Sequence, residues 1–229
     1  MIDHERDLAS LHEATERLLT DAASWDNASV AEPSRLPGWT RGHVLAHLAR
    51  NAEALVNVFE GRPMYASAEA RDADIERDAS RPLDVQLADV RETAERFRAL
   101  TAAPGDWSRT VELRNGVTDS ASRVPFRRWV EVDLHHVDLG CGYELEDLPE
   151  EFVEREIDFL AERFAGHPDV PSTALRADDD RTWTTGGGAE GASVTVSGPA
   201  PDLLGWLAGR RDGAALKTEG GPLPQLPAL

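Results

Sequence analysis

The sequence predicts an α+β protein in which a helical bundle precedes a smaller unit of strands and one helix. Three segments within the first 100 residues repeat apolar side chains at the spacing of one helix face. After "AGHPDVPS", the chain changes to short β-prone runs separated by "DDD" and "GGG". We therefore expect a bundle at residues 1–165 and a small α/β domain at residues 166–229.

The helical part is divided by proline, glycine and capping residues. The segment "FRRWVEVDLHHVDL" fits a helix, although its three valines would also suit a strand. Between the second and third helices, "RPMYASAEARDADIERDAS" is expected to be a long polar connection. Helices are expected at residues 3–25, 40–60, 82–100, 126–139 and 149–164.

The remaining segments predict short strands and turns. Asn115-Gly116 is a turn signal that indicates a small hairpin. Near the C-terminus, "STALRA", "RTWTT" and "ASVTVSG" are expected to be strands, and "PAPDLLGWLAGR" a short helix. The glycine-rich "TTGGGAEG" lacks the lysine of a phosphate-binding Walker loop, so we expect a flexible hairpin connection there.

The charge balance limits the partners. The 229 residues carry a formal net charge of -18, and Lys217 is the only lysine. Such a field repels nucleic acid and anionic membranes, and an anionic substrate would need a local arginine or a metal. No apolar run approaches the roughly 20 residues of a membrane span, and "MIDHERDLAS" lacks the features of a secretion signal. We expect a cytoplasmic protein that acts on a small molecule.

Cys141 is the only cysteine, which rules out an intrachain disulfide and a zinc site built on several thiolates. It follows the predicted helix at 126–139, and the dipole at a helix C-terminus disfavours a thiolate. Any metal must therefore use nitrogen and oxygen ligands. Thiol chemistry would need either this residue or a thiol supplied from outside.

Two helical segments concentrate possible metal ligands. His43 and His47 lie four residues apart in "RLPGWTRGHVLAHLARNAEAL", and Glu131 and His135 share a face of a later helix. Two imidazoles and one carboxylate that leave a position open form a common catalytic metal site. One histidine of the first pair with Glu131 and His135 would supply this set. Spacing alone does not choose between His43 and His47, and structural or surface histidines are the alternative.

Three further polar residues lie close to His135 on the same predicted helix. His136 is turned by about 100° from His135 on an ideal helix, so it fits a supporting or surface position better than a ligand. Asp133 and Asp138 could orient an imidazole through its second nitrogen. Solvated charge is the interpretation that we favour for both carboxylates.

Arg210 and Arg211 end the last predicted helix. An arginine can bind a carboxylate through two hydrogen bonds. The alternative is that these side chains cap the carbonyl groups at the end of the helix. The sequence alone leaves both interpretations open.

Four stretches resemble the mycothiol-dependent maleylpyruvate isomerases, which belong to the DinB-like group of metal-binding four-helix proteins. They are "LPGWTRGHVLAHLARNAEAL", "GRPMYASAEARDADI", "RRWVEVDLHHVDLG" and "VTVSGPAPDLLGWLAGRRDG". The resemblance implies a DinB-like four-helix bundle that holds a divalent metal, usually zinc, followed by a small α/β C-terminal domain. It also implies that His47, Glu131 and His135 are the metal ligands, and that Arg210 holds a substrate carboxylate.

The implied reaction is the cis-trans isomerisation of maleylpyruvate to fumarylpyruvate in the gentisate route of aromatic degradation. Addition of a thiolate to the cis double bond leaves a single bond that can rotate, and elimination then gives the trans isomer. The thiol is expected to be a small cofactor, with mycothiol favoured over ergothioneine or glutathione. A thiol S-transferase with the same site and a non-catalytic binding protein are the alternatives.

Overall fold

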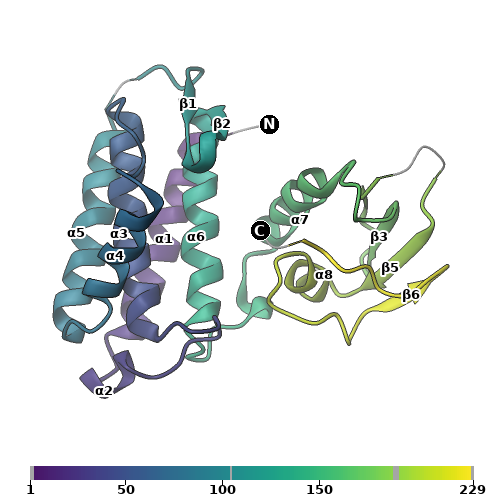
Figure 1. Cartoon of the computed structure of the whole chain (residues 1–229), viewed down its shortest axis with the longest axis horizontal. Helices are drawn as coiled ribbons and strands as arrows, with labels where there is room; N and C mark the ends of the chain where they lie inside the picture. The colour runs from purple at the N-terminus through teal and green to yellow at the C-terminus, as the bar shows by residue number, and fades with distance from the viewer. Residues whose placement is uncertain (1–2, 104, 188–190, 228–229) are drawn as a thin grey trace. The chain divides into compact units, whose positions relative to one another are not determined.

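Four long helices pack side by side in the first part of the computed structural model (Figure 1). Each contacts two of the others, so the four enclose one core. The structure describes residues 3–103, 105–187 and 191–227. The helices are α1 (His4–Ala22), α3 (Arg41–Phe59), α5 (Leu83–Thr101) and α6 (Val124–Asp138). This bundle belongs to a compact unit, Met1–Tyr143, and confirms the helix expected at 126–139.

The apolar spacing of these helices builds the core. Helix α1 buries Leu11, Leu18 and Leu19 on one face, and Asp3 caps its first turn by accepting a hydrogen bond from the Arg6 amide at 3.1 Å. Helix α3 is buried on most sides, because it packs against α4, α5 and α6. Central α3 therefore offers a rigid position for a functional side chain.

The polar connection expected between the second and third helices contains a further helix, α4 (Ala68–Asp78). Ser67 caps it by accepting a hydrogen bond from the Ala70 amide at 3.1 Å. Its C-terminal end approaches α3 closely. A Cβ atom on Gly42 would lie 2.0 Å from the carbonyl oxygen of Ala79, so only glycine permits this contact.

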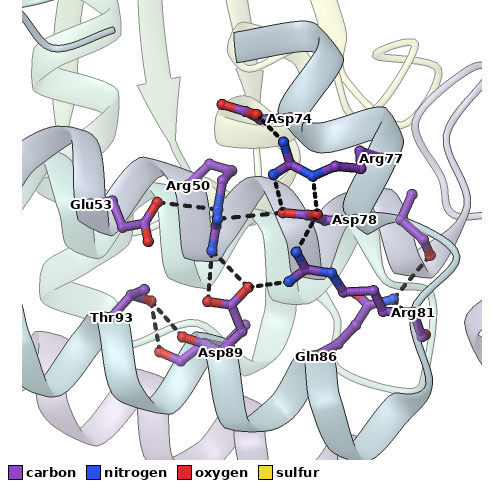
Figure 2. Close-up of polar contacts among 11 residues, drawn as sticks. Arg50, Glu53, Asp74, Arg77, Asp78, Arg81, Gln86, Asp89 and Thr93 are labelled. Carbon is purple, nitrogen blue, oxygen red and sulfur yellow. Dashed lines mark hydrogen bonds and ion pairs between the residues drawn. The ribbon is translucent and has the colours of Figure 1, made fainter. Parts of the chain in front are cut away.

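A network of arginines and aspartates fixes α4 against α3 and α5 (Figure 2). The buried carboxylate of Asp78 lies 3.3 Å from Arg50 Nη1, 2.8 Å from Arg77 Nε and 2.5 Å from Arg81 Nη2. Arg50 Nη2 also lies 2.6 Å from Asp89 Oδ1 on α5. One buried carboxylate thus connects side chains from three parts of the chain.

Short elements complete the first unit. The hairpin predicted at Asn115-Gly116 is confirmed: β1 (Thr110–Glu112) pairs antiparallel with β2 (Thr118–Ser120). Asn115 and Gly116 have φ values of 60° and 72°, the left-handed conformations that such a turn requires. A four-residue helix, α2 (Asn27–Val30), lies between the helices predicted at 3–25 and 40–60, where the sequence predicted no helix.

The second compact unit, Glu144–Leu229, combines two helices with a four-stranded sheet. Strand β3 pairs antiparallel with β4 and parallel with β5, and β5 pairs antiparallel with β6. Its elements are α7 (Glu150–Phe164), β3 (Thr173–Ala177), β4 (Thr182–Thr185), β5 (Val194–Gly198), α8 (Ala200–Leu207) and β6 (Lys217–Glu219).

Helix α7 packs on α8 and β4, so the contacts assign it to the second unit, whereas the sequence-based division at residue 165 assigned it to the bundle. Strand β6 was not predicted, because its three side chains are all exposed and show no apolar alternation. Within "TTGGGAEG", residues 188–190 lie outside the described part of the chain. Strands β4 and β5 are not neighbours, so this stretch does not join a hairpin.

The α+β fold class is confirmed, with helices and one short hairpin in the first unit and mixed helices and sheet in the second. In the part of the chain that the structure describes, no helix is both long and apolar enough to cross a membrane.

Candidate metal centre

His47, Glu131 and His135 come together between α3 and α6. One potential ligand atom from each residue lies within 4.8 Å of the others. His47 Nε2 lies 2.9 Å from Glu131 Oε2, and His135 Nε2 lies 3.3 Å from the same oxygen. The two imidazole rings meet edge to face with centroids 4.7 Å apart. The structure therefore brings together the three residues that the family resemblance had selected.

His135 is oriented by a carboxylate on its own helix. Its Nδ1 lies 2.8 Å from Oδ2 of Asp138, whose side chain is buried. Burial lowers the pKa of His135, but the contacts with Asp138 and Glu131 outweigh this effect, and the net pKa is raised. A carboxylate on Nδ1 is the usual support for an imidazole that binds a metal through Nε2. His135 is thus prepared for that role.

His47 has a different neighbour. Its Nδ1 lies 3.3 Å from Nη2 of Arg71, on α4. Burial lowers the pKa of His47 to about 4, against the opposing effect of Glu131. A guanidinium only donates hydrogen bonds, so the neutral imidazole accepts from Arg71 through Nδ1 and carries its proton on Nε2, facing Glu131.

Glu131 is ionised in this environment. Burial raises its pKa, but hydrogen bonds from His135 and His47 outweigh burial and hold the pKa well below its usual range. Metal binding requires a deprotonated carboxylate and imidazoles with a free nitrogen lone pair. Two imidazoles and one carboxylate, with one imidazole already oriented, fit a divalent cation such as zinc.

His43 does not face this cluster. Its Nδ1 lies 3.1 Å from the Thr40 amide nitrogen, and its own amide donates to Thr40 Oγ1 at 3.4 Å. This reciprocal arrangement caps α3. The Nε2 of His43 lies 3.1 Å from Glu76. The first-turn position of His43 therefore explains why it cannot substitute for His47, which lies one turn further along.

The other candidates on α6 have structural partners. His136 is buried, stacks on the Tyr143 ring at a centroid distance of 4.1 Å, and lies 3.1 Å from Asp21. Asp133 is buried and accepts a hydrogen bond from Trp129 Nε1 at 2.6 Å. Asp133 and Asp138 are both buried, so the expectation that they are solvated charges is wrong. Of these two carboxylates, Asp138 is the one that contacts an imidazole of the cluster.

Several polar residues beside the cluster were not predicted from the sequence. Arg128 is 2% exposed, and its Nη1 donates to Asn51 Oδ1 at 2.9 Å. Among the described residues, no group accepts a hydrogen bond from its Nη2. Burial lowers the pKa of Arg128 to about 10, and Glu131 opposes this shift. The helical spacing could have identified Asn51 and Arg128. Asn51 follows His47 by four residues, and Arg128 precedes Glu131 by three.

Arg71 and Tyr65 come from the segment that was expected to be an irregular connection. The guanidinium carbon of Arg71 lies 5.9 Å from the centroid of the Tyr65 ring. Burial raises the pKa of Tyr65, against the effect of Arg71, so its hydroxyl keeps its proton. Polar side chains thus extend the site toward α4.

In the second unit, Arg210 Nη1 donates to the carbonyl oxygen of Ala208 at 2.7 Å, at the end of α8. This contact is the helix-capping role that the sequence left open for Arg210 beside carboxylate binding. Arg211 forms ion pairs with Asp202 at 2.6 Å and with Glu146 at 2.8 Å. Arg210 also lines an open pocket beside Trp206, and binding of a substrate carboxylate there stays a prediction.

Cys141 lies in the turn after α6 and is half-buried. Burial raises the pKa of its thiol above the usual value. A thiol that holds its proton more tightly is a weaker source of thiolate. The environment of Cys141 therefore does not favour a nucleophilic role.

A four-helix bundle with a candidate metal centre of two histidines and one glutamate, in a chain that also contains a small α/β unit, defines the class of protein as a two-part α+β helical-bundle protein. The family model described as the mycothiol maleylpyruvate isomerase N-terminal domain matches residues 11–140. A second model, described as the C-terminal domain of the same group, matches residues 147–228. The chain belongs to the mycothiol maleylpyruvate isomerase family.

Solved structures agree with this assignment. The chain is similar to the crystal structure of a mycothiol-dependent maleylpyruvate isomerase, with 26% sequence identity and a TM-score of 0.89. The match covers 99% of this chain and 97% of the other. The structure of a histidine-to-alanine mutant of a mycothiol-dependent maleylpyruvate isomerase matches with the same values. No curated protein sequence matches significantly.

Proposed function

We propose that this protein is a metal- and thiol-dependent isomerase that converts maleylpyruvate to fumarylpyruvate. The observation that carries the proposal is the cluster of His47, Glu131 and His135 in a chain whose two units both match the isomerase family. The names of the matching family model and structures support mycothiol as the thiol and maleylpyruvate as the substrate.

We assign His47, Glu131 and His135 as ligands of a divalent cation, with zinc as the expected metal. When bound, such a cation supplies positive charge that lowers the pKa of a coordinating thiol. Asp138 keeps the His135 ring in place through Nδ1. The thiol is expected to come from outside the chain, because burial raises the pKa of Cys141.

The substrate is a dicarboxylate, and the protein has a net charge of -18. A strongly negative protein needs local positive charge to admit such a molecule. Arg71 and Arg128 supply it beside the cluster. We expect Arg210 to contribute a further guanidinium, as the family resemblance implies.

The test is a turnover assay with the full chain, zinc and a panel of thiols, namely mycothiol, ergothioneine and glutathione. We expect the ultraviolet spectrum of maleylpyruvate to change to that of fumarylpyruvate with mycothiol. His47→Ala and Glu131→Ala should abolish both metal content and turnover, and His43→Ala is the control that keeps both.

The same assay separates the alternatives. An S-transferase would consume the thiol and accumulate a stable thioether, whereas an isomerase regenerates the thiol. Absence of turnover with all three thiols would count against the proposal. A cytoplasmic location stays a prediction of the sequence.

A further inference from the structure

The two histidines of the candidate centre differ at the nitrogen that faces away from Glu131. His135 Nδ1 faces the carboxylate of Asp138 at 2.8 Å, and His47 Nδ1 faces the guanidinium of Arg71 at 3.3 Å. Both imidazoles direct Nε2 to the same oxygen of Glu131. The carboxylate of Asp138 can accept a hydrogen bond from Nδ1 of His135. The guanidinium of Arg71 can only donate one to Nδ1 of His47.

This difference matters for the proton on His47. An imidazole that binds a cation through Nε2 carries its proton on Nδ1 and donates it to an acceptor. The guanidinium of Arg71 has no acceptor atom. With a cation on Nε2 of His47, two donors would therefore face each other, and the contact between Arg71 and His47 could not persist.

Arg71 is placed to find another acceptor in the same site. Its side chain is 12% exposed, so its charge is largely removed from solvent. Its Nη1 pairs with the carboxylate of the adjacent Asp72, which is 64% exposed, at 2.7 Å. Nη2, the nitrogen beside His47, is the one that loses its acceptor when a cation binds.

The surroundings favour an anion as the new acceptor. Tyr65 lies beside Arg71 with its hydroxyl protonated, and among the described residues no group accepts a hydrogen bond from Nη2 of the buried Arg128, on α6. A cation on His47 would add further positive charge. A carboxylate is the ligand whose charge and paired oxygens match a guanidinium.

We propose that Arg71 is a carboxylate-binding residue of the isomerase, which holds His47 in the metal-free protein and is released to the substrate when the metal binds. This inference deepens the proposed function and rests on it for the identity of the dicarboxylate. It predicts two opposite effects of removing Arg71. Zinc should bind more tightly, because an opposing charge and donor are lost, and a dicarboxylate should bind more weakly.

The experiment measures both effects on purified full-length protein without turnover. Zinc affinity is measured by competition with a chelator, and affinity for maleate, a cis-unsaturated dicarboxylate, by calorimetry on the zinc-loaded protein. For Arg71→Ala we expect zinc affinity to rise by about threefold or more, and maleate affinity to fall by about tenfold or more, the usual size of a lost charge-assisted hydrogen bond. Arg71→Lys should recover part of the maleate affinity, because it restores the charge.

Arg98→Ala is the matched control, since Arg98 is exposed on α5 and pairs only locally with Glu95 among the described residues. It should leave both affinities unchanged. Maleamide, the neutral diamide, should bind wild type and Arg71→Ala equally. Circular dichroism and thermal unfolding establish that each variant is folded, and Arg71→Gln replaces Arg71→Ala if the latter is not.

The outcomes separate this inference from the proposed function. Unchanged maleate affinity, or unchanged or weakened zinc affinity, in the folded Arg71 variants would overturn the inference, even if the enzyme isomerises maleylpyruvate. Opposite shifts in the two affinities would support it. They would do so even if maleylpyruvate is not turned over, because neither measurement requires catalysis.

Discussion

Oδ2 of Asp138 lies 2.8 Å from Nδ1 of His135, three residues earlier on α6, while Nε2 of that histidine faces Glu131. The same helix therefore supplies a candidate ligand and the group that orients it. Asp138→Asn should lower zinc affinity by about 10- to 100-fold, the usual effect of removing such support. Competition with a chromogenic chelator measures the change.

Asp26→Asn is the control for this substitution. Asp26 also accepts hydrogen bonds, but at the N-cap of α2, where asparagine caps equally well. We expect its zinc affinity to equal that of wild type. Equal affinities for Asp138→Asn and wild type would contradict the orienting role.

His47 and His43 should respond differently to substitution. His47→Ala removes a candidate ligand, so zinc content should fall to background. His43→Ala should retain zinc and lose about 1 kcal/mol of stability, because His43 completes the cap of α3 with Thr40. Metal analysis and urea unfolding measure the two effects. Loss of zinc from both variants in folded form would contradict the distinction.

The sequence pattern could not separate these two histidines, because both share a helix face at four-residue spacing. What separates them is position: His43 is at the third residue of α3, where unpaired amides need a partner, and His47 reaches α6. The long amphipathic helices were predicted because apolar spacing encodes them directly. The partner of His47 on α6 depends on how two helices pack, which spacing does not specify.

Helix α4 shows the limit of apolar patterning. Only Ile75 and Asp78 are buried within it, so its sequence resembles a polar connection. The Ser67 cap is the local signal that could have predicted a helix, and the ion pair between Asp78 and Arg50 of α3 depends on tertiary structure. Arg71 was missed for the same reason, since its contact with His47 exists only once α4 is packed on α3.

The ion-pair network around Asp78 leads to a stability prediction. Asp78 is 1% exposed and contacts Arg50, Arg77 and Arg81 (Figure 2). Asp78→Ala would leave Arg50 without this buried partner and should lower the free energy of unfolding by about 3–5 kcal/mol. Urea denaturation followed by circular dichroism measures it.

Asp74→Ala is the matched control, because Asp74 pairs with Arg77 on the same helix but is 45% exposed. Exposed ion pairs contribute about 0–1 kcal/mol, so this variant should unfold close to wild type. Similar destabilisation by the two substitutions would show that burial of Asp78 is not what matters.

Cys141 provides a test of where the reacting thiol comes from. Burial raises the pKa of its thiol, and it follows the C-terminal end of α6, where the helix dipole opposes a thiolate. Cys141→Ser should therefore retain isomerisation within about twofold of wild type, and wild type should show no turnover until an external thiol is added. Turnover and zinc content are measured together. A folded, zinc-loaded Cys141→Ser that is inactive with every thiol would assign the chemistry to Cys141, because the metal centre and the added thiol would both be present.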